Sequence, residues 1–159
     1  MANTKVPVEL LPTNITVEGN LDVSSGSIKL DGNYPTGTGN VALGNQALDD
    51  GSLTGSFNTA VGDNALTLNT SGSQNVGIGT QALNNTTTGN YNVSVGTQSL
   101  DTNTTGSFNT AVGDNALYSS TTASNNTAVG YQSLYANTTG AQNTAVGRLA
   151  LDAATTADD

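Results

Sequence analysis

The stretch T-G-S-F-N-T-A-V-G-D-N-A-L at residues 54–66 decides the fold, because the chain repeats it and residues 105–117 are the same thirteen letters. Aligning every related stretch on its asparagine gives seven copies, anchored at Asn40, Asn58, Asn75, Asn92, Asn109, Asn126 and Asn143. The first interval is 18 residues and the next five are 17. A fixed period of this length indicates a stack of identical structural units rather than one globular core.

Each position of the repeat defines a column, meaning the residues that occupy that position in successive copies. Two residues after the asparagine the column is always small, and a glycine stands four residues after it in every copy, from Gly44 to Gly147. Between these two lies the aliphatic column: Leu43, Val61, Ile78, Val95, Val112, Val129 and Val146. A leucine column follows: Leu48, Leu66, Leu83, Leu100, Leu117, Leu134 and Leu151. Such strict columns argue against disorder, despite the low content of aromatic residues.

The segment Asn-x-Ala-Val is short, rich in β-forming residues and stops at a glycine, so it predicts one strand per coil. Neighbouring side chains of a strand point to opposite faces, and a thin solenoid has room inside only for the small column. The aliphatic column must then lie outside, where soluble monomers rarely carry a continuous apolar row. We therefore expect an all-β parallel solenoid, or β-roll, of seven coils of about 17 residues, assembled as an oligomer through the aliphatic column.

Two further columns predict backbone features. Glycine in every copy implies a positive φ angle or a close approach of neighbouring coils. The asparagines are expected to form a ladder, each amide bonding to the coils above and below. The segment G-x-x-A-L is ambiguous, because five residues are compatible with either a second strand or a single helical turn.

The chain divides into three parts. Residues 1–35 lack the repeat and are expected to form an extended docking arm followed by a small β cap, which would cover the edge of the first coil. Residues 36–151 carry the seven coils. Residues 152–159 form a short acidic tail that is expected to fray.

Composition excludes several classes of function. Only 9 % of the 159 residues are charged and the net charge is −9, with Lys5, Lys29 and Arg148 as the only basic residues. No phosphate-neutralising patch can be built from these, so neither nucleic acid nor an anionic membrane surface is an expected partner. No apolar stretch is long enough to predict membrane insertion, and no signal peptide is evident.

Catalytic, cofactor and metal sites are not expected. The chain has no histidine and no cysteine, and its hydroxyl groups lack a base to activate them. Residues 77–82, G-I-G-T-Q-A, imitate a dinucleotide-binding fingerprint, but the required helix and the later acidic residue are absent from the pattern. Asp63 and Asp114 share a column but lie three coils apart, about 14 Å at the strand spacing, which is too far to share one ion.

A surface-binding role can be carried only by the variable columns. Exposed aromatics beside amides and hydroxyls suit a glycan, and the candidates are Phe57, Tyr91, Phe108 and Tyr131. The alternative interpretation, which we favour, is that these rings pack between coils or between chains.

The phrases N-T-A-V-G-x-x-A-L and T-T-G-x-x-N-T-A-V-G, found within residues 36–151, resemble repeats of bacteriophage tail-fibre and related virion fibre proteins. They are also similar to the shorter head repeat of trimeric autotransporter adhesins, whose heads are trimeric left-handed parallel β-rolls. The resemblance implies a parallel homotrimer, with the aliphatic column at or near its axis.

The expected function is accordingly a non-enzymatic fibre or spike of a phage virion. It would be made in the host cytoplasm, docked to the particle through residues 1–35, and able to contact a host-surface glycan. A bacterial surface adhesin head is the first alternative, although the secretion signal, stalk and anchor of that family are not found in the sequence. An ice-binding solenoid is the second alternative, suggested by Thr59, Thr110, Thr127 and Thr144 but weakened by Val41, Val76 and Val93 in the same column.

Overall fold

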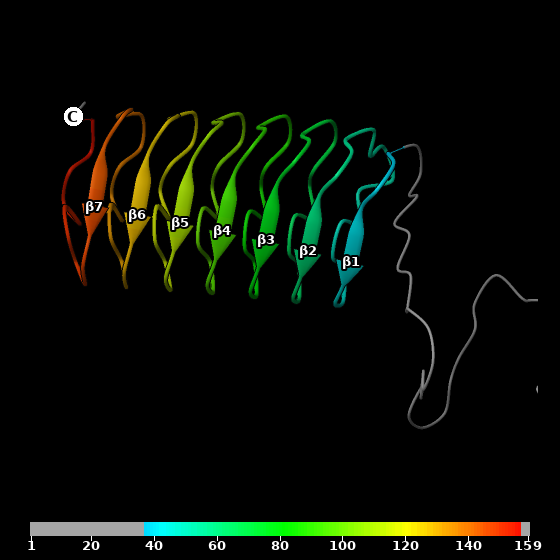
Figure 1. Cartoon of the computed structure of the whole chain (residues 1–159), viewed down its shortest axis with the longest axis horizontal. Coiled ribbons are helices and arrows are strands. Elements are labelled where there is room, and N and C mark those ends of the chain that lie inside the picture. The colour runs from blue at the N-terminus through cyan, green and yellow to red at the C-terminus, as the bar shows by residue number, and fades with distance from the viewer. Residues whose placement is uncertain (1–36, 157–159) are drawn as a thin grey trace, which may run out of the picture.

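The computed structural model describes residues 37–156 as a straight stack of coils with one short strand in each. The strands are β1 (Val41–Leu43), β2 (Thr59–Val61), β3 (Val76–Ile78), β4 (Val93–Val95), β5 (Thr110–Val112), β6 (Thr127–Val129) and β7 (Thr144–Val146). They lie side by side in chain order as one seven-stranded sheet, and every neighbouring pair is parallel (Figure 1). This confirms the predicted all-β parallel solenoid with turns of about 17 residues.

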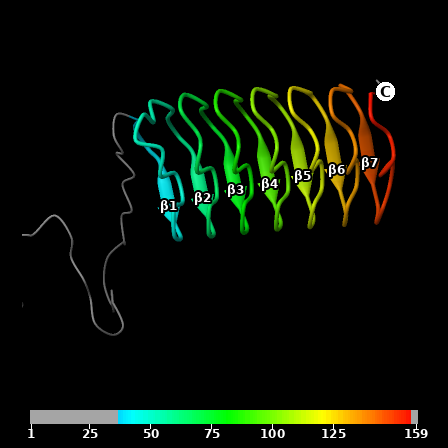
Figure 2. The same ribbon diagram turned by 180° about the vertical axis from the view of Figure 1, so that it is seen from behind.

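The register of the sheet aligns the columns found in the sequence. Ala60 pairs with Gly77 and Val61 pairs with Ile78, and the same pairing recurs at every junction. The view from behind shows the same regular succession of strands (Figure 2). The extra residue of the first interval does not disturb this register, because it is absorbed in a turn before β2. There the Leu53 N–H donates to the Asp50 carbonyl at 3.1 Å.

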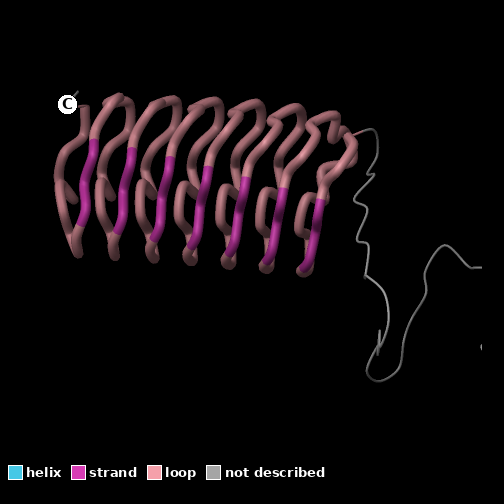
Figure 3. Tube along the Cα trace, in the orientation of Figure 1, coloured by secondary structure: helices cyan, strands magenta, loops and turns pink. Residues whose placement is uncertain are grey.

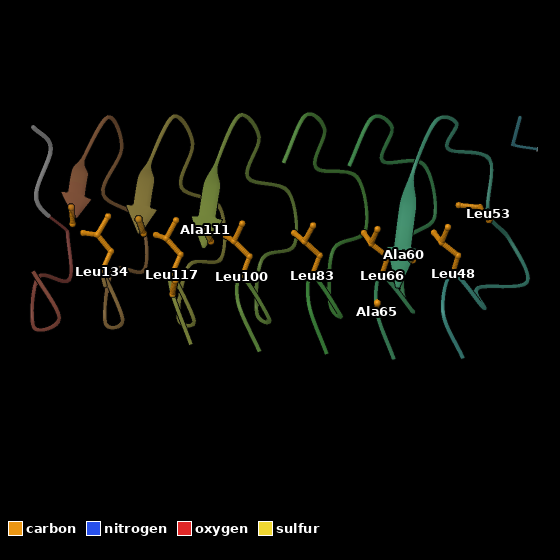
Figure 4. Packing of buried hydrophobic residues seen from close by; sticks show 13 residues of the cluster. Leu48, Leu53, Ala60, Ala65, Leu66, Leu83, Leu100, Ala111, Leu117 and Leu134 are labelled. Carbon is orange, nitrogen blue, oxygen red and sulfur yellow. The ribbon is translucent and has the colours of Figure 1, made fainter. Parts of the chain in front are cut away.

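The core is a single row of leucines running along the inside of the stack (Figure 4). The five leucines of the column from Leu66 to Leu134 are fully buried, and Leu53 extends the row at the first coil. Small side chains of the strands, such as Ala60 and Ala111, pack beside them. Burying each leucine contributes roughly 1.5–3 kcal/mol, so the row is the main apolar contribution within one chain.

The asparagine column forms the predicted ladder, and every member is buried. The backbone N–H of Asn109 donates to Asn92 Oδ1 at 3.0 Å. Its side-chain Nδ2 donates to the Ala123 carbonyl at 2.8 Å and to Asn92 Oδ1 at 3.2 Å. One amide thus connects two neighbouring coils and also fixes the following corner of its own coil. Buried polar groups satisfied in this way stabilise the stack and specify its register.

The G-x-x-A-L segment is neither of the two forms that the sequence left open. It is a turn, and none of residues 37–156 is helical (Figure 3). In the second coil the Ala65 N–H donates to the Gly62 carbonyl at 3.4 Å, while the Leu66 N–H donates to the Ala82 carbonyl of the next coil at 3.0 Å. Bonds to the neighbouring coil therefore replace the bonds that a helical turn would make within itself.

Glycine is needed at Gly62 for both reasons that the sequence suggested. Its φ angle is +135°, and a Cβ there would lie 2.6 Å from the carbonyl oxygen of Gly79 in the next coil. Any side chain would push the coils apart. The predicted arm and β cap, residues 1–35, lie outside the described residues, and no helix within residues 37–156 could span a membrane.

Candidate interaction surface

The most extensive feature on the outside of the rod is a face three columns wide, which we call the outer sheet face. In the second coil the alternation of the strand turns Asn58 and Ala60 inward, where both are fully buried. Phe57, Thr59 and Val61 therefore point outward together. The outer sheet face comprises the column before the asparagine, the column after it and the aliphatic column. At about 4.8 Å per coil and 3.3 Å per residue, it spans roughly 34 Å by 13 Å.

The aliphatic column lies on this face, as predicted. Val146 is 69 % exposed and Leu43 is 46 % exposed, while Ile78 and Val112 are 39 % and 37 % exposed. The remaining members are half-buried by their neighbours in the stack. Within a single chain this column is therefore uncovered along its whole length, which is unusual for a surface of this size on a soluble monomer.

No residue of the outer sheet face carries a charge, although the chain as a whole has a net charge of −9. The column before the asparagine holds Gly39, Phe57, Gln74, Tyr91, Phe108, Asn125 and Gln142. The column after it holds Val41, Thr59, Val76, Val93, Thr110, Thr127 and Thr144. The nearest charged side chains, Asp63, Asp114 and Arg148, stand beyond the glycine column. The face is thus free of the like-charge repulsion that opposes self-association elsewhere on an acidic chain.

Three of the four sequence-predicted surface residues lie on the outer sheet face. Tyr91 and Phe108 stack on each other, with ring centroids 4.9 Å apart and planes within 5°. Phe57 is 63 % exposed and its ring covers Gly39, since a Cβ on that glycine would lie 2.8 Å from a ring carbon. The fourth residue, Tyr131, lies outside this face, and the Arg148 guanidinium sits 5.5 Å from its ring centroid.

Sequence reasoning missed two features outside this face. Tyr118 and Tyr135 stack with their ring centroids 5.3 Å apart, in the column directly after the leucines. Asp101 precedes them in that column and is 7 % exposed. Desolvation raises the pKa of its carboxyl above the ordinary value of 3.8, while a hydrogen bond with the Asn84 side chain opposes the rise. The regular 17-residue spacing of the three residues was the available signal.

The structure does not assemble a reactive centre from the remaining candidates. Among residues 37–156, no group of three or more acidic, histidine or cysteine side chains could hold a metal ion. The glycines at 77 and 79 belong to β3 and to the turn that follows it, and Gly77 is buried inside the coil. A phosphate-binding loop at the start of a helix is therefore not what this glycine pattern forms.

No protein-family model, no curated protein and no solved structure matches this chain. The function is therefore argued from the outer sheet face and from the repeat itself.

Proposed function

We propose that this chain is a non-enzymatic structural rod of a bacteriophage fibre or spike, assembled as a parallel homotrimer through the outer sheet face. The observation that carries the proposal is the continuous, uncharged aliphatic column on the outside of the sheet. Covering such side chains contributes roughly 1.5–3 kcal/mol for each one fully buried, so seven columns of contacts can hold three chains together.

The occupant of the face is another copy of this chain because the face repeats at the coil spacing. Side chains that interdigitate along the whole rod need a partner with the same period. A second copy in parallel orientation supplies that period by construction. A closed ring of copies related by rotation also limits the assembly to a defined number of chains.

The placement on a phage particle rests on the resemblance of N-T-A-V-G-x-x-A-L to fibre repeats. In this proposal residues 1–35 dock the rod to the particle and the coils project outward, so that the rod spaces or presents rather than catalyses. Detection of this chain in purified phage particles by antibody labelling tests the placement, and its absence from particles would contradict it.

One observation favours a second candidate, an ice-binding surface. Thr59, Thr110, Thr127 and Thr144 do face outward on the regular sheet, as an array of hydroxyl groups would require. The same column holds Val41, Val76 and Val93, which interrupt the array. A freezing-hysteresis measurement separates the two functions, and the fibre proposal expects no hysteresis.

The trimer is tested by light scattering on the purified full chain. We expect a mass three times that of the 15.9 kDa protomer. Val112→Asp should abolish the trimer, because the symmetry of the assembly introduces three carboxylates at one level of the apolar interface. Thr122→Asp adds the same charge at an exposed position off the outer sheet face and should leave the trimer intact. A well-folded, monomeric wild-type chain would refute the proposal.

A further inference from the structure

We infer that the stacked pair Tyr91 and Phe108 is a contact between copies of this chain and not a site for a host-surface glycan. This inference rests on the proposed trimer and names a second line of contacts within it. It assigns the most exposed aromatic pair of the outer sheet face to one of the two roles that the sequence left open.

The orientation of the rings is the first argument. Their planes are within 5° of parallel at a centroid distance of 4.9 Å, so each ring turns one face to the other. Their neighbours in the same column are Gln74 and Asn125, one coil away on either side. A sugar binds aromatic residues by stacking on a ring face. Here the faces are directed along the rod, and what the side of the rod presents is ring edges.

The backbone holds the pair rigidly in place. Tyr91 and Phe108 have φ angles of +57° and +59°. Their N–H groups donate to the carbonyls of Ser73 and Asn90 in the preceding coils, at 3.1 Å and 3.0 Å. A pre-ordered aromatic pair loses little conformational entropy when another surface covers it, which is the property of an interface anchor.

The surroundings of the pair point to a second copy as the occupant. Tyr91 is 49 % exposed and Phe108 is 56 % exposed, so about half of each side chain is available to a partner. Both lie on the uncharged outer sheet face beside the aliphatic column, and no acidic side chain shares that face. Ring edges carry partial positive charge and pack well against aliphatic side chains, which the neighbouring copy presents at the same coil spacing.

The experiment is site-specific photo-crosslinking of the full chain with p-benzoylphenylalanine at one position at a time. Position 108 tests the inference, position 112 reports on the aliphatic interface, and position 131 is the control. Tyr131 is also an exposed aromatic residue, but it lies off the outer sheet face beneath Arg148. We expect covalent dimers and trimers after irradiation from positions 108 and 112, and at least fivefold less product from position 131.

The outcomes separate this inference from the proposed function. Crosslinks at position 112 without crosslinks at position 108 overturn the inference and leave the trimer standing. A monomeric wild-type chain that crosslinks at neither position overturns both. Equal crosslinking at positions 108 and 131 also overturns the inference, because the contact would then not be specific to the outer sheet face.

Discussion

At the scale of single residues, a left-handed backbone explains which side chains the repeat accepts. The seven residues of the leucine column have φ angles between +50° and +55°. A β-branched residue in this region is strained far more than an unbranched one. The aliphatic column lies in strands and accepts valine, isoleucine and leucine, whereas the leucine column never varies. The unbroken leucines thus combine full burial with the need for an unbranched Cβ.

Leu117→Ile tests this account against Leu117→Met as its matched control. Leu117 is fully buried with a φ angle of +52°, and both substitutions keep a large apolar side chain. We expect the isoleucine variant to lose about 1–2 kcal/mol more free energy of unfolding than the methionine variant, because only isoleucine branches at Cβ. Denaturant unfolding at one fixed protein concentration measures the difference. Equal losses would show that the leucine column is set by volume alone.

Asp101 is the one titratable residue of the described chain whose burial changes its protonation. Burial disfavours its ionised form and raises its pKa, so the folded chain binds this proton more tightly than the unfolded chain does. Its Oδ1 has no hydrogen-bond partner, which adds to the cost of the charge. The stability contributed by this group is therefore present at low pH and is lost as pH rises from 3.8 through the raised pKa.

Asp101→Asn removes this penalty, and Asp114→Asn is its control at an exposed position. We expect the Asp101 variant to melt at a higher temperature than wild type at pH 7, with the advantage disappearing below pH 3.8. The Asp114 variant should show no comparable pH-dependent advantage. Calorimetric scans of the three proteins across this range provide the measurement. A lower melting temperature for Asp101→Asn at pH 7 would contradict the account.

At the scale of the element, the unit of this protein is the coil. Each junction repeats the same bonds: Thr110 N–H donates to the Asn126 carbonyl at 2.8 Å, and Gly113 N–H donates to the Val95 carbonyl at 2.8 Å. The leucine row and the asparagine ladder add the same contacts at each level. Stability is therefore close to a sum over identical junctions, as in other repeat proteins.

Deleting residues 75–91 tests this modularity, because the deletion joins Gln74 to Asn92 and keeps every column in phase. We expect a folded rod, one coil shorter, with a modest loss of stability. Deleting residues 75–82 instead shifts all later columns, so leucines and asparagines would leave the interior and the stack should not fold across the break. Circular dichroism melts compare the two, and equal damage from both deletions would rule out the modular stack.

At the scale of the whole molecule, an acidic rod has one lengthwise face on which aliphatic side chains are exposed without charges among them. The carboxylates of the described chain stand elsewhere, at positions such as Asp63, Asp101 and Asp114. This distribution confines close approach of another copy to the outer sheet face. The rod, the interface and the spacing role then follow from one repeated sequence, and the trimer and the virion remain predictions with their own tests.

The sequence by itself determined the period, the position of the strands, the asparagine ladder and the sides on which the small and aliphatic columns lie. It could do so because stacking places each column at one position in space, so seven aligned copies report on one environment. The absence of β-branched residues from the leucine column was also a readable signal of its left-handed backbone, and it was missed.

Only the tertiary structure decided the form of the G-x-x-A-L segment, the burial of Asp101 and the direction of the ring faces. A five-residue segment has no periodicity to distinguish strand from helical turn, and its form depends on bonds to another coil, such as the one from Leu66 to Ala82. Burial and ring orientation likewise depend on which side chains stand one coil away. These are contacts across 16 or 17 residues of chain, and local sequence preferences do not specify them.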